Sequence, residues 1–89
     1  MATKQSADTI KTAVLGGGSF GTAIANLLAA NGHQVCLWLR NEARANEINQ
    51  ARMNSFYLPD ITLHDGVRAD TELAAVVEDI SLEVYLPFI

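Results

Sequence analysis

A short apolar run that ends in spaced glycines constrains this chain more than any other stretch. Residues 13–21 read AVLGGGSFG, so Gly16, Gly18 and Gly21 form a GxGxxG pattern, and a helix-forming segment, Thr22 to Asn31, begins at once. In a strand–turn–helix unit, Gly16 permits the turn, Gly18 lets the backbone approach a pyrophosphate, and Gly21 lets the helix pack closely on the strand. The stretch therefore predicts an anion-binding turn at a helix N-terminus, as a dinucleotide requires.

The segments on either side of the glycines support this interpretation, which a GxGxxG pattern alone would support only weakly. Residues 11–15 predict a short buried strand, Gly32 predicts the end of the helix, and residues 34–39 predict a second apolar strand. The resulting βαβ unit has the usual length of about 30 residues. Apolar side chains recur at helical spacing on one face of the helix, and two small residues, Gly21 and Ala25, lie one turn apart. The apolar side chains are Ile24, Leu27 and Leu28.

The length of the chain limits it to one small domain. Eighty-nine residues are fewer than a complete dinucleotide-binding domain of two βαβαβ halves usually needs. The expected fold class is therefore α/β, with a Rossmann-type doubly wound parallel sheet of which only the first βαβαβ half is present. Residues 1–10 are polar and are expected to be a disordered leader, and residues 11–89 are expected to be the partial NAD(P)-binding domain.

Charge and composition argue against several classes of partner. The net charge of −4 gives no general attraction to nucleic acid or to an anionic membrane, so neither is an expected partner. The first ten residues lack the apolar centre of a secretory signal, and no later stretch approaches the roughly 20 apolar residues of a membrane span, so a cytoplasmic location is expected. Cys36 is the only cysteine and is predicted to be a buried, unreactive thiol.

The end of the second predicted strand bears on the choice of cofactor. In the dinucleotide fold, a carboxylate at this tip holds the ribose 2′-hydroxyl of NAD, whereas an arginine accommodates the 2′-phosphate of NADP. Arg40 lies at the tip, and Glu42 comes two residues too late. Because a guanidinium can donate two hydrogen bonds to a phosphate, we predict binding of NADPH or NADH with a preference for NADP. The alternative is that Arg40 is a solvated residue at a strand end.

The segment after the second strand predicts scaffold. Asn41 is expected to cap a helix over residues 42–53. Residues 54–60 predict a loop, in which Phe56 and Tyr57 either plug the loop or contact a ligand. The predicted inward stripe of the helix comprises Ala45, Ile48 and either Ala51 or Arg52.

Short elements are expected after this loop. Residues 61–63 and 67–69 predict extended pieces about an intervening turn. A helix over residues 72–79 follows, capped by Asp70 or Thr71. The apolar face predicted for this helix comprises Leu73, Val76 and Val77.

The last ten residues, ISLEVYLPFI, give conflicting signals. Leu82, Val84 and Leu86 alternate as in a strand. A central parallel strand is buried on both faces, however, so Glu83 is out of character there, and Pro87 also argues against a strand. If this tail fails to cover the flank of the first strand, the open edge permits self-association.

No residue pattern predicts catalysis or a metal site. His33 and His64 have no second ligand at metal spacing, so both are expected to be solvated. The sequence contains no nucleophile–base pair and no pair of acids at a spacing typical of catalysis. We therefore predict no catalytic residues and no metal ligands in this chain.

A long stretch of the chain strongly resembles the N-terminal part of bacterial NAD(P)-dependent glycerol-3-phosphate dehydrogenase. It reads VLGGGSFGTAIANLLAANGHQVCLWLRN, followed by EINQARMNSFYLPDITL and VRADTELAAVVED, and covers about residues 11–79. The combination of features is more specific than the glycines alone. These features are Ser19 and Phe20 inside the glycine turn, Leu37 and Trp38 before a basic tip, and a loop with Asn54, Tyr57, Leu58 and Pro59.

The resemblance implies functions for individual residues. Ser19 and Phe20 would contact the cofactor at the phosphate turn. Arg40 would hold its adenosine end, and Tyr57 would border the pocket. The complete predicted set of cofactor-binding residues is Gly16, Gly18, Ser19, Phe20, Gly21, Arg40 and Tyr57.

The resemblance also implies an activity, which is that of the family. Its members are oxidoreductases that transfer a hydride between NAD(P)H and dihydroxyacetone phosphate to form sn-glycerol 3-phosphate, a step in phospholipid biosynthesis. In the family, the substrate ligands lie further along the chain, so we expect the helical substrate-binding domain to be absent here and the 89-residue chain alone to be inactive.

The sequence departs from the family pattern at ISLEVYLPFI, where an apolar strand and an Ala-Val-Pro-Ser-like loop would follow. This departure leaves three interpretations open: a fragment of a longer enzyme, a natural truncation or frameshifted product, or a stand-alone nucleotide-binding module. An interaction protein that uses the half-fold as a scaffold and binds no nucleotide is a further alternative.

Overall fold

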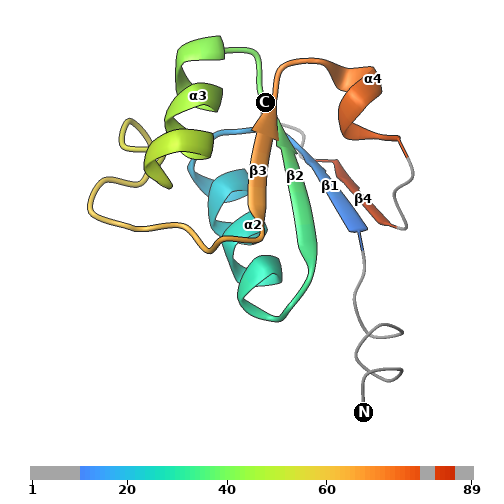
Figure 1. Ribbon diagram of the computed structural model, residues 1–89, viewed down its shortest axis with the longest axis horizontal. Coiled ribbons are helices and arrows are strands. Elements are labelled where there is room, and N and C mark those ends of the chain that lie inside the picture. The colour runs from blue at the N-terminus through green and yellow to red at the C-terminus, as the bar shows by residue number, and fades with distance from the viewer. Residues whose placement is uncertain (1–10, 79–81, 86–89) are drawn as a thin grey trace.

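The computed structural model describes residues 11–78 and 82–85 of the chain. These residues form one parallel four-stranded sheet in the order β3-β2-β1-β4 (Figure 1). The strands are β1 (Lys11–Leu15), β2 (Gln34–Trp38), β3 (Val67–Asp70) and β4 (Leu82–Tyr85). The expected leader, residues 1–10, lies outside the described residues.

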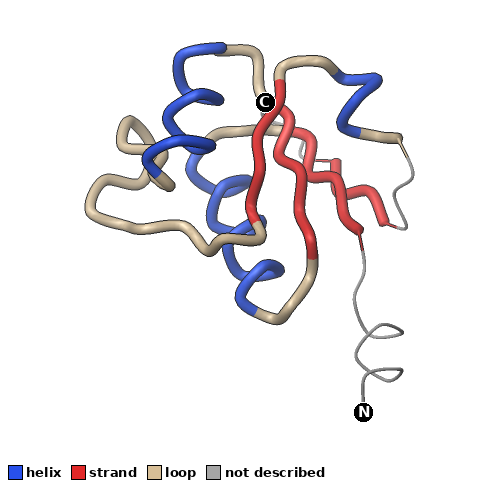
Figure 2. Tube along the Cα trace, in the orientation of Figure 1, coloured by secondary structure: helices blue, strands red, loops and turns tan. Residues whose placement is uncertain are grey.

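Helices lie on both faces of the sheet (Figures 1 and 2). The two longer helices, α2 (Ser19–Ala30) and α3 (Glu42–Ala51), share one face, and the short helix α4 (Leu73–Val76) lies on the other. Helices on both faces of a parallel sheet define the doubly wound α/β class, so the predicted first half of a Rossmann-type fold is confirmed. Within the described ranges, no helix is long and apolar enough to span a bilayer.

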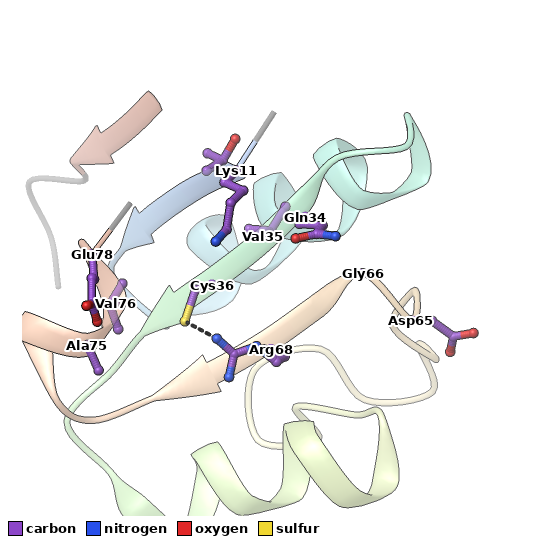
Figure 3. Close-up of a pocket in the computed structure, with 11 residues that line it drawn as sticks. Lys11, Gln34, Val35, Cys36, Asp65, Gly66, Arg68, Ala75, Val76 and Glu78 are labelled. Atoms are coloured by element: carbon purple, nitrogen blue, oxygen red, sulfur yellow. Dashed lines mark hydrogen bonds between the residues drawn. The ribbon is translucent and has the colours of Figure 1, made fainter. Parts of the chain in front are cut away.

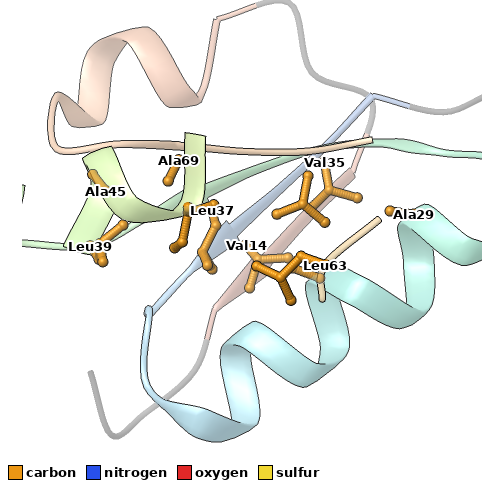
Figure 4. Close-up of a cluster of buried hydrophobic side chains, with 11 residues drawn as sticks. Val14, Ala29, Val35, Leu37, Leu39, Ala45, Leu63 and Ala69 are labelled. Carbon is orange, nitrogen blue, oxygen red and sulfur yellow. The ribbon is translucent and has the colours of Figure 1, made fainter. Parts of the chain in front are cut away.

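The hydrophobic core is divided by the sheet because successive strand residues point to opposite faces. In β1, Val14 packs into the larger cluster beneath α2 and α3, whereas Ala13 and Leu15 pack against Val76 of α4. Figure 4 shows the larger cluster between the sheet and its two helices. Its labelled members are Val14, Ala29, Val35, Leu37, Leu39, Ala45, Leu63 and Ala69.

Helix α2 begins three residues earlier than the sequence predicts, at Ser19 instead of Thr22. The reason is that the Thr22 N–H donates to the carbonyl of Gly18 over 2.9 Å, which closes the first helical turn at the glycines. Gly18 is consequently the N-cap residue, and no side chain caps this end. The N–H groups of the first turn therefore lie immediately after the glycine turn and lack partners within the helix.

The inward face of α2 is made of small residues, which include Gly21 and Ala25 as the sequence indicated, and Leu27 does not belong to it. Leu27 is 63% exposed, and Ile24 and Leu28 flank the core from partly buried positions. The buried residues of α2 are Gly21, Thr22, Ala25 and Ala29. Small side chains let the helix approach the sheet closely, and the larger apolar residues then fall outside the contact. The helix ends as predicted, since Gly32 adopts a φ of 94°.

Helix α3 begins as predicted and ends early. The side-chain oxygen of Asn41 accepts the Arg44 N–H over 3.0 Å, so Asn41 is the cap. The helix ends at Ala51 and not at residue 53 because Arg52 adopts the left-handed conformation, with a φ of 60°. Ala45 and Ile48 are the buried residues of the helix, whereas Ala51 is exposed and Arg52 is half-buried.

The C-terminal elements differ most from expectation. Residues 61–63 form no strand, whereas the extended piece predicted at 67–69 is β3 and pairs in parallel with β2. Helix α4 is shorter than predicted, and Glu72 occupies its cap position. Asp70 accepts the Glu72 N–H over 2.9 Å without being the cap itself. Leu73, predicted to face inward, is 46% exposed.

Strand β4 exists despite the conflicting signals in the sequence. It pairs in parallel with β1, with Thr12 opposite Leu82 and Leu15 opposite Tyr85. The flank of β1 is therefore covered by β4, and β3 and β4 are the edge strands of the described sheet, so self-association stays a prediction. Residues Leu86 and Pro87 lie outside the described part of the chain.

Candidate cofactor-binding site

The glycine turn lies at the carboxyl end of β1, next to the carboxyl end of β2. Ligands of open parallel sheets bind outside these ends. The Gly16 N–H donates to the carbonyl of Trp38 over 3.1 Å, which ties the turn to the last residue of β2. Gly16 has a φ of 139°, a conformation that side-chain-bearing residues rarely adopt, so this glycine permits the turn as predicted.

A cavity of about 160 Å³ opens between the glycine turn, the tip of β2, the start of α3 and the loop after α3. It brings together four of the residues predicted to bind cofactor: Gly16, Gly18, Arg40 and Tyr57. The complete lining is Gly16, Gly17, Gly18, Trp38, Leu39, Arg40, Asn41, Arg44 and Tyr57.

The other three predicted residues lie in the first turn of α2 and do not line this cavity. Ser19 and Phe20 are exposed, and the Phe20 side chain has 70% of its surface accessible. Gly21 is buried on the side of α2 that faces the sheet, in agreement with its predicted packing role. Ser19 and Phe20 are therefore accessible to a ligand that extends beyond the cavity along the start of α2.

Neighbouring glycines in the turn have different surroundings. A Cβ atom added to Gly18 would meet no atom within 4 Å, so this residue leaves open space in front of the turn. A Cβ atom added to Gly17 would lie 2.4 Å from the Cβ of Leu39. The sequence pattern indicates no role for Gly17, because Leu39, which leaves no room for a side chain at Gly17, follows the next strand. The turn thus needs Gly17 for packing and Gly18 for access.

Two arginines reach the cavity from the β2 tip and the start of α3. Arg40 is exposed at the tip, as predicted, and Arg44 follows one helical turn later. The guanidinium carbon of Arg44 lies 3.9 Å from the ring centroid of Phe56 and 5.1 Å from that of Tyr57. Arg44 was missed in the sequence because Arg40 precedes the helix, so helical spacing does not relate the two arginines.

Tyr57 lines the cavity, whereas Phe56 lies beside Tyr57 and outside the lining, and neither residue plugs the loop. Their rings meet edge to face with centroids 4.9 Å apart, and they remain 67% and 37% exposed. The interpretation of both residues as a buried plug is therefore wrong. We call Arg44, Phe56 and Tyr57 the aromatic rim, in which a cation lies against two rings. Arg44 and Tyr57 line the cavity.

A larger cavity of about 590 Å³ lies on the α4 face of the sheet and reaches the amino ends of β1 and β2 at Lys11 and Gln34 (Figure 3). Cys36 and Arg68 line it, with 3.9 Å between the Arg68 Nη2 and the thiol sulfur. Burial raises the pKa of the half-buried Cys36 thiol, which therefore stays protonated. Its position away from the carboxyl ends makes this cavity a poor candidate for a dinucleotide.

The histidines lie in different environments and line neither cavity. His64 is exposed, and its backbone N–H donates to Asn26 over 2.7 Å. His33 is half-buried and not fully solvated as predicted. In the described part of the chain, no group of three His, Cys, Asp or Glu side chains could hold a metal ion.

Taken with the sheet order, the glycine turn that enters α2 defines a Rossmann-type dinucleotide-binding half-domain. The family model described as the N-terminus of NAD-dependent glycerol-3-phosphate dehydrogenase matches residues 11–86. The chain therefore belongs to the NAD-dependent glycerol-3-phosphate dehydrogenase family of oxidoreductases, in which it corresponds to the N-terminal, NAD-binding part.

Individual relatives agree with this assignment. The chain is 50% identical over 72 residues to a glycerol-3-phosphate dehydrogenase, NAD(P)+, of Teredinibacter turnerae, a match that covers 81% of this chain and 21% of that protein. A protein of the same name from Pseudomonas entomophila is 54% identical over 66 residues, covering 74% and 19%. The chain spans about a fifth of the length of these curated relatives.

Solved structures show the same relationship. The crystal structure of glycerol-3-phosphate dehydrogenase from Coxiella burnetii superposes with a TM-score of 0.80 at 31% identity, covering 86% of this chain and 24% of that one. Glycerol-3-phosphate dehydrogenase from yeast also gives a TM-score of 0.80, at 30% identity. The half-domain fold is therefore that of the family's N-terminal part.

Proposed function

We propose that this chain binds the adenosine and pyrophosphate part of an NAD(P) cofactor in the cavity between the glycine turn and the tip of β2. The observation that carries the proposal is that an unobstructed Gly18 backbone and two arginines, Arg40 and Arg44, line one cavity. A pyrophosphate at this turn would accept hydrogen bonds from the free N–H groups at the start of α2 and would face the positive end of the helix dipole.

The same arrangement supports a preference for NADP. In the described part of the chain, no Asp or Glu lines the cavity, so no carboxylate is placed to hold a ribose 2′-hydroxyl or to repel a 2′-phosphate. Arg40 would bind the 2′-phosphate, and Arg44, held against Phe56, would add a second positive charge. Tyr57 would border the adenosine end, while Ser19 and Phe20 would contact the part of the cofactor that extends past the turn.

We further propose that the chain supplies the cofactor site for hydride transfer between NAD(P)H and dihydroxyacetone phosphate and does not perform this reaction by itself. Residues 11–89 act, in this proposal, as a partial cofactor-binding domain that needs a separate substrate-binding domain. Hydride transfer needs the nicotinamide ring fixed against the substrate carbon and a proton donor beside its oxygen. The cavity of about 160 Å³ has room for one end of a dinucleotide, so the nicotinamide would remain in solvent.

Calorimetric titration with NADPH and a turnover assay test these two statements separately. We expect the 89-residue chain to bind NADPH weakly and to leave the absorbance of NADPH unchanged in the presence of dihydroxyacetone phosphate. A full-length relative serves as the positive control in both measurements. Absence of any NADPH binding by a folded chain would favour the interaction-scaffold alternative, and turnover above the rate without enzyme would show that the catalytic groups lie within this chain.

A further inference from the structure

Asn54 is fully buried beneath the glycine turn, although it comes from the loop after α3. Its Nδ2 donates to the carbonyl of Gly17 over 3.1 Å and to the Oγ1 of Thr22 over 2.8 Å. The Gly17 oxygen can only accept, so the amide nitrogen, and not the amide oxygen, must face the turn. The need for a donor at the Gly17 carbonyl therefore fixes the orientation of the Asn54 amide against the turn.

Thr22 completes the contact from inside α2. Its buried hydroxyl accepts from Asn54 and donates to the carbonyl of Gly18 over 2.7 Å, with the Gly17 carbonyl slightly farther at 3.3 Å. Two side chains therefore hold two consecutive carbonyls of the turn. We call Asn54, Thr22 and the carbonyls of Gly17 and Gly18 the polar cluster.

The polar cluster determines where the N–H groups on the opposite side of the turn point. Each peptide unit is planar and trans, so its C=O and its N–H point in opposite directions. A Gly17 carbonyl held inward directs the Gly18 N–H outward. The Gly18 carbonyl accepts both the N–H and the hydroxyl of Thr22, which directs the Ser19 N–H outward. These N–H groups are the ones that a pyrophosphate at the start of α2 would contact.

We propose that Asn54 is a positioning residue for the cofactor, which orients the Gly18 N–H toward the pyrophosphate by holding the Gly17 carbonyl behind it and supports the Ser19 N–H through Thr22. The proposal rests on the proposed function and assigns that site a residue that never touches the ligand. Asn54 also connects the turn to the aromatic rim, because its own carbonyl accepts the N–H groups of Tyr57 over 3.1 Å and of Leu58 over 2.8 Å.

The position of the remaining amide atom agrees with this role. Among the described residues, Asn54 Oδ1 is buried and has no hydrogen-bond partner. An unpartnered buried oxygen costs free energy, so the side chain is not optimised for packing alone. The fold therefore keeps the two donor contacts of Asn54, to the Gly17 carbonyl and to the Thr22 hydroxyl, although the amide oxygen is left without a partner.

The test compares two ligands in the 89-residue chain and its variants. NADP+ carries the pyrophosphate, whereas 2′-AMP carries the 2′-phosphate and adenosine without it. In Asn54→Ala we expect the dissociation constant of NADP+ to rise about tenfold or more, as for the loss of a buried hydrogen-bond donor, and that of 2′-AMP to stay the same. Asn49→Ala is the matched control, because Asn49 makes two side-chain bonds to the backbone of Ala69 on β3, away from the turn.

Asn54→Asp adds a pH signature to the comparison of the two ligands, because a loss of folding would weaken both ligands and a loss of the turn contact would weaken only NADP+. Burial raises the pKa of the introduced carboxyl above its ordinary value of about 3.9. The protonated carboxyl can donate to the Gly17 carbonyl, and the ionised one cannot. Relative to the unmodified chain at the same pH, NADP+ affinity should therefore be retained at low pH and lost as the pH rises through that raised pKa.

The outcomes separate a failure of the positioning role from a failure of the proposed function. Unchanged NADP+ affinity in folded Asn54→Ala, or equal weakening of NADP+ and 2′-AMP, would overturn the positioning role. If the unmodified chain binds no NADP+, the proposed function fails, and ¹⁵N relaxation then decides the role of Asn54 without ligand. We expect Gly18 and Ser19 to gain fast motion in Asn54→Ala and not in Asn49→Ala, and equal mobility in both variants would overturn the role.

Discussion

NADPH binding is expected to weaken at least tenfold in Gly18→Ala, with no loss of thermal stability. The added methyl group meets no protein atom within 4 Å, and Gly18 has a φ of −74°, which alanine adopts without strain. The open space that the methyl group would enter is where the proposed site places the pyrophosphate, so the methyl group obstructs the ligand and not the fold. Replacing glycine at an unstrained position also restricts the unfolded chain, which stabilises slightly, by about 0.4–1 kcal/mol.

Gly17→Ala is the matched variant and should behave in the opposite way. Its methyl group would lie 2.4 Å from the Cβ of Leu39, an atom that moves only with its backbone. Overpacking of this kind costs about 1–3 kcal/mol, which is a large share of the stability of a small domain. Thermal unfolding followed by circular dichroism, with NADPH titration of each folded variant, measures both effects. Equal loss of binding in two equally stable variants would contradict the separate roles of the two glycines.

Cofactor preference should reverse or disappear in Arg40→Asp. A charge-assisted contact to a phosphate contributes about 1–3 kcal/mol, so the ratio of NADPH to NADH affinity should fall by roughly 5- to 150-fold. The introduced carboxylate would repel a 2′-phosphate and could accept a hydrogen bond from a 2′-hydroxyl. Calorimetric dissociation constants for NADPH and NADH provide the ratio.

Arg68→Asp controls for long-range electrostatics. It changes the net charge by the same amount, but Arg68 lies on β3 and lines the other cavity. We expect its NADPH to NADH ratio to match that of the unmodified chain. An unchanged ratio in Arg40→Asp would remove Arg40 from the site, and equal changes in both variants would show that the preference depends on overall charge and not on a contact.

The central βαβ unit could be predicted from sequence because its signals are local. Strand β1 matches the predicted residues 11–15, and β2 ends one residue before the predicted end. Gly32 and Asn41 mark helix ends through their own conformation and side chain, as the sequence indicated. In each case the determining residue and the element it ends are neighbours in the chain.

Features that depend on contacts between distant segments could not be predicted in this way. Leu27 is exposed because α2 turns its face of small residues toward the sheet, and helical periodicity does not specify which face the sheet contacts. Strand β4 forms because β1 offers a pairing edge, although Glu83 looked unsuitable for it. The early end of α3 follows from the left-handed conformation of Arg52, whose guanidinium bonds the carbonyl of His64.

The residues of the candidate site that belong to a sequence motif could be predicted. The residues that act through packing or buried hydrogen bonds could not. The glycine pattern and the basic tip indicated Gly16, Gly18 and Arg40, which line one cavity. Gly17 and Asn54 matter through contacts with Leu39 and Thr22, which lie far from them in the chain. Their roles became visible only when the fold placed these segments together.

Mapping NADP+ onto the backbone by ¹H–¹⁵N NMR tests the central claim most directly. Titration of the ¹⁵N-labelled chain should shift the amide signals of Gly17, Gly18, Ser19 and Arg40, with smaller changes at Tyr57. Amides around the larger cavity on the α4 face, such as Cys36 and Arg68, serve as internal controls and should stay in place. Shifts centred on Cys36 and Arg68, or no shifts in a folded chain at saturating NADP+, would contradict a cofactor site at the glycine turn.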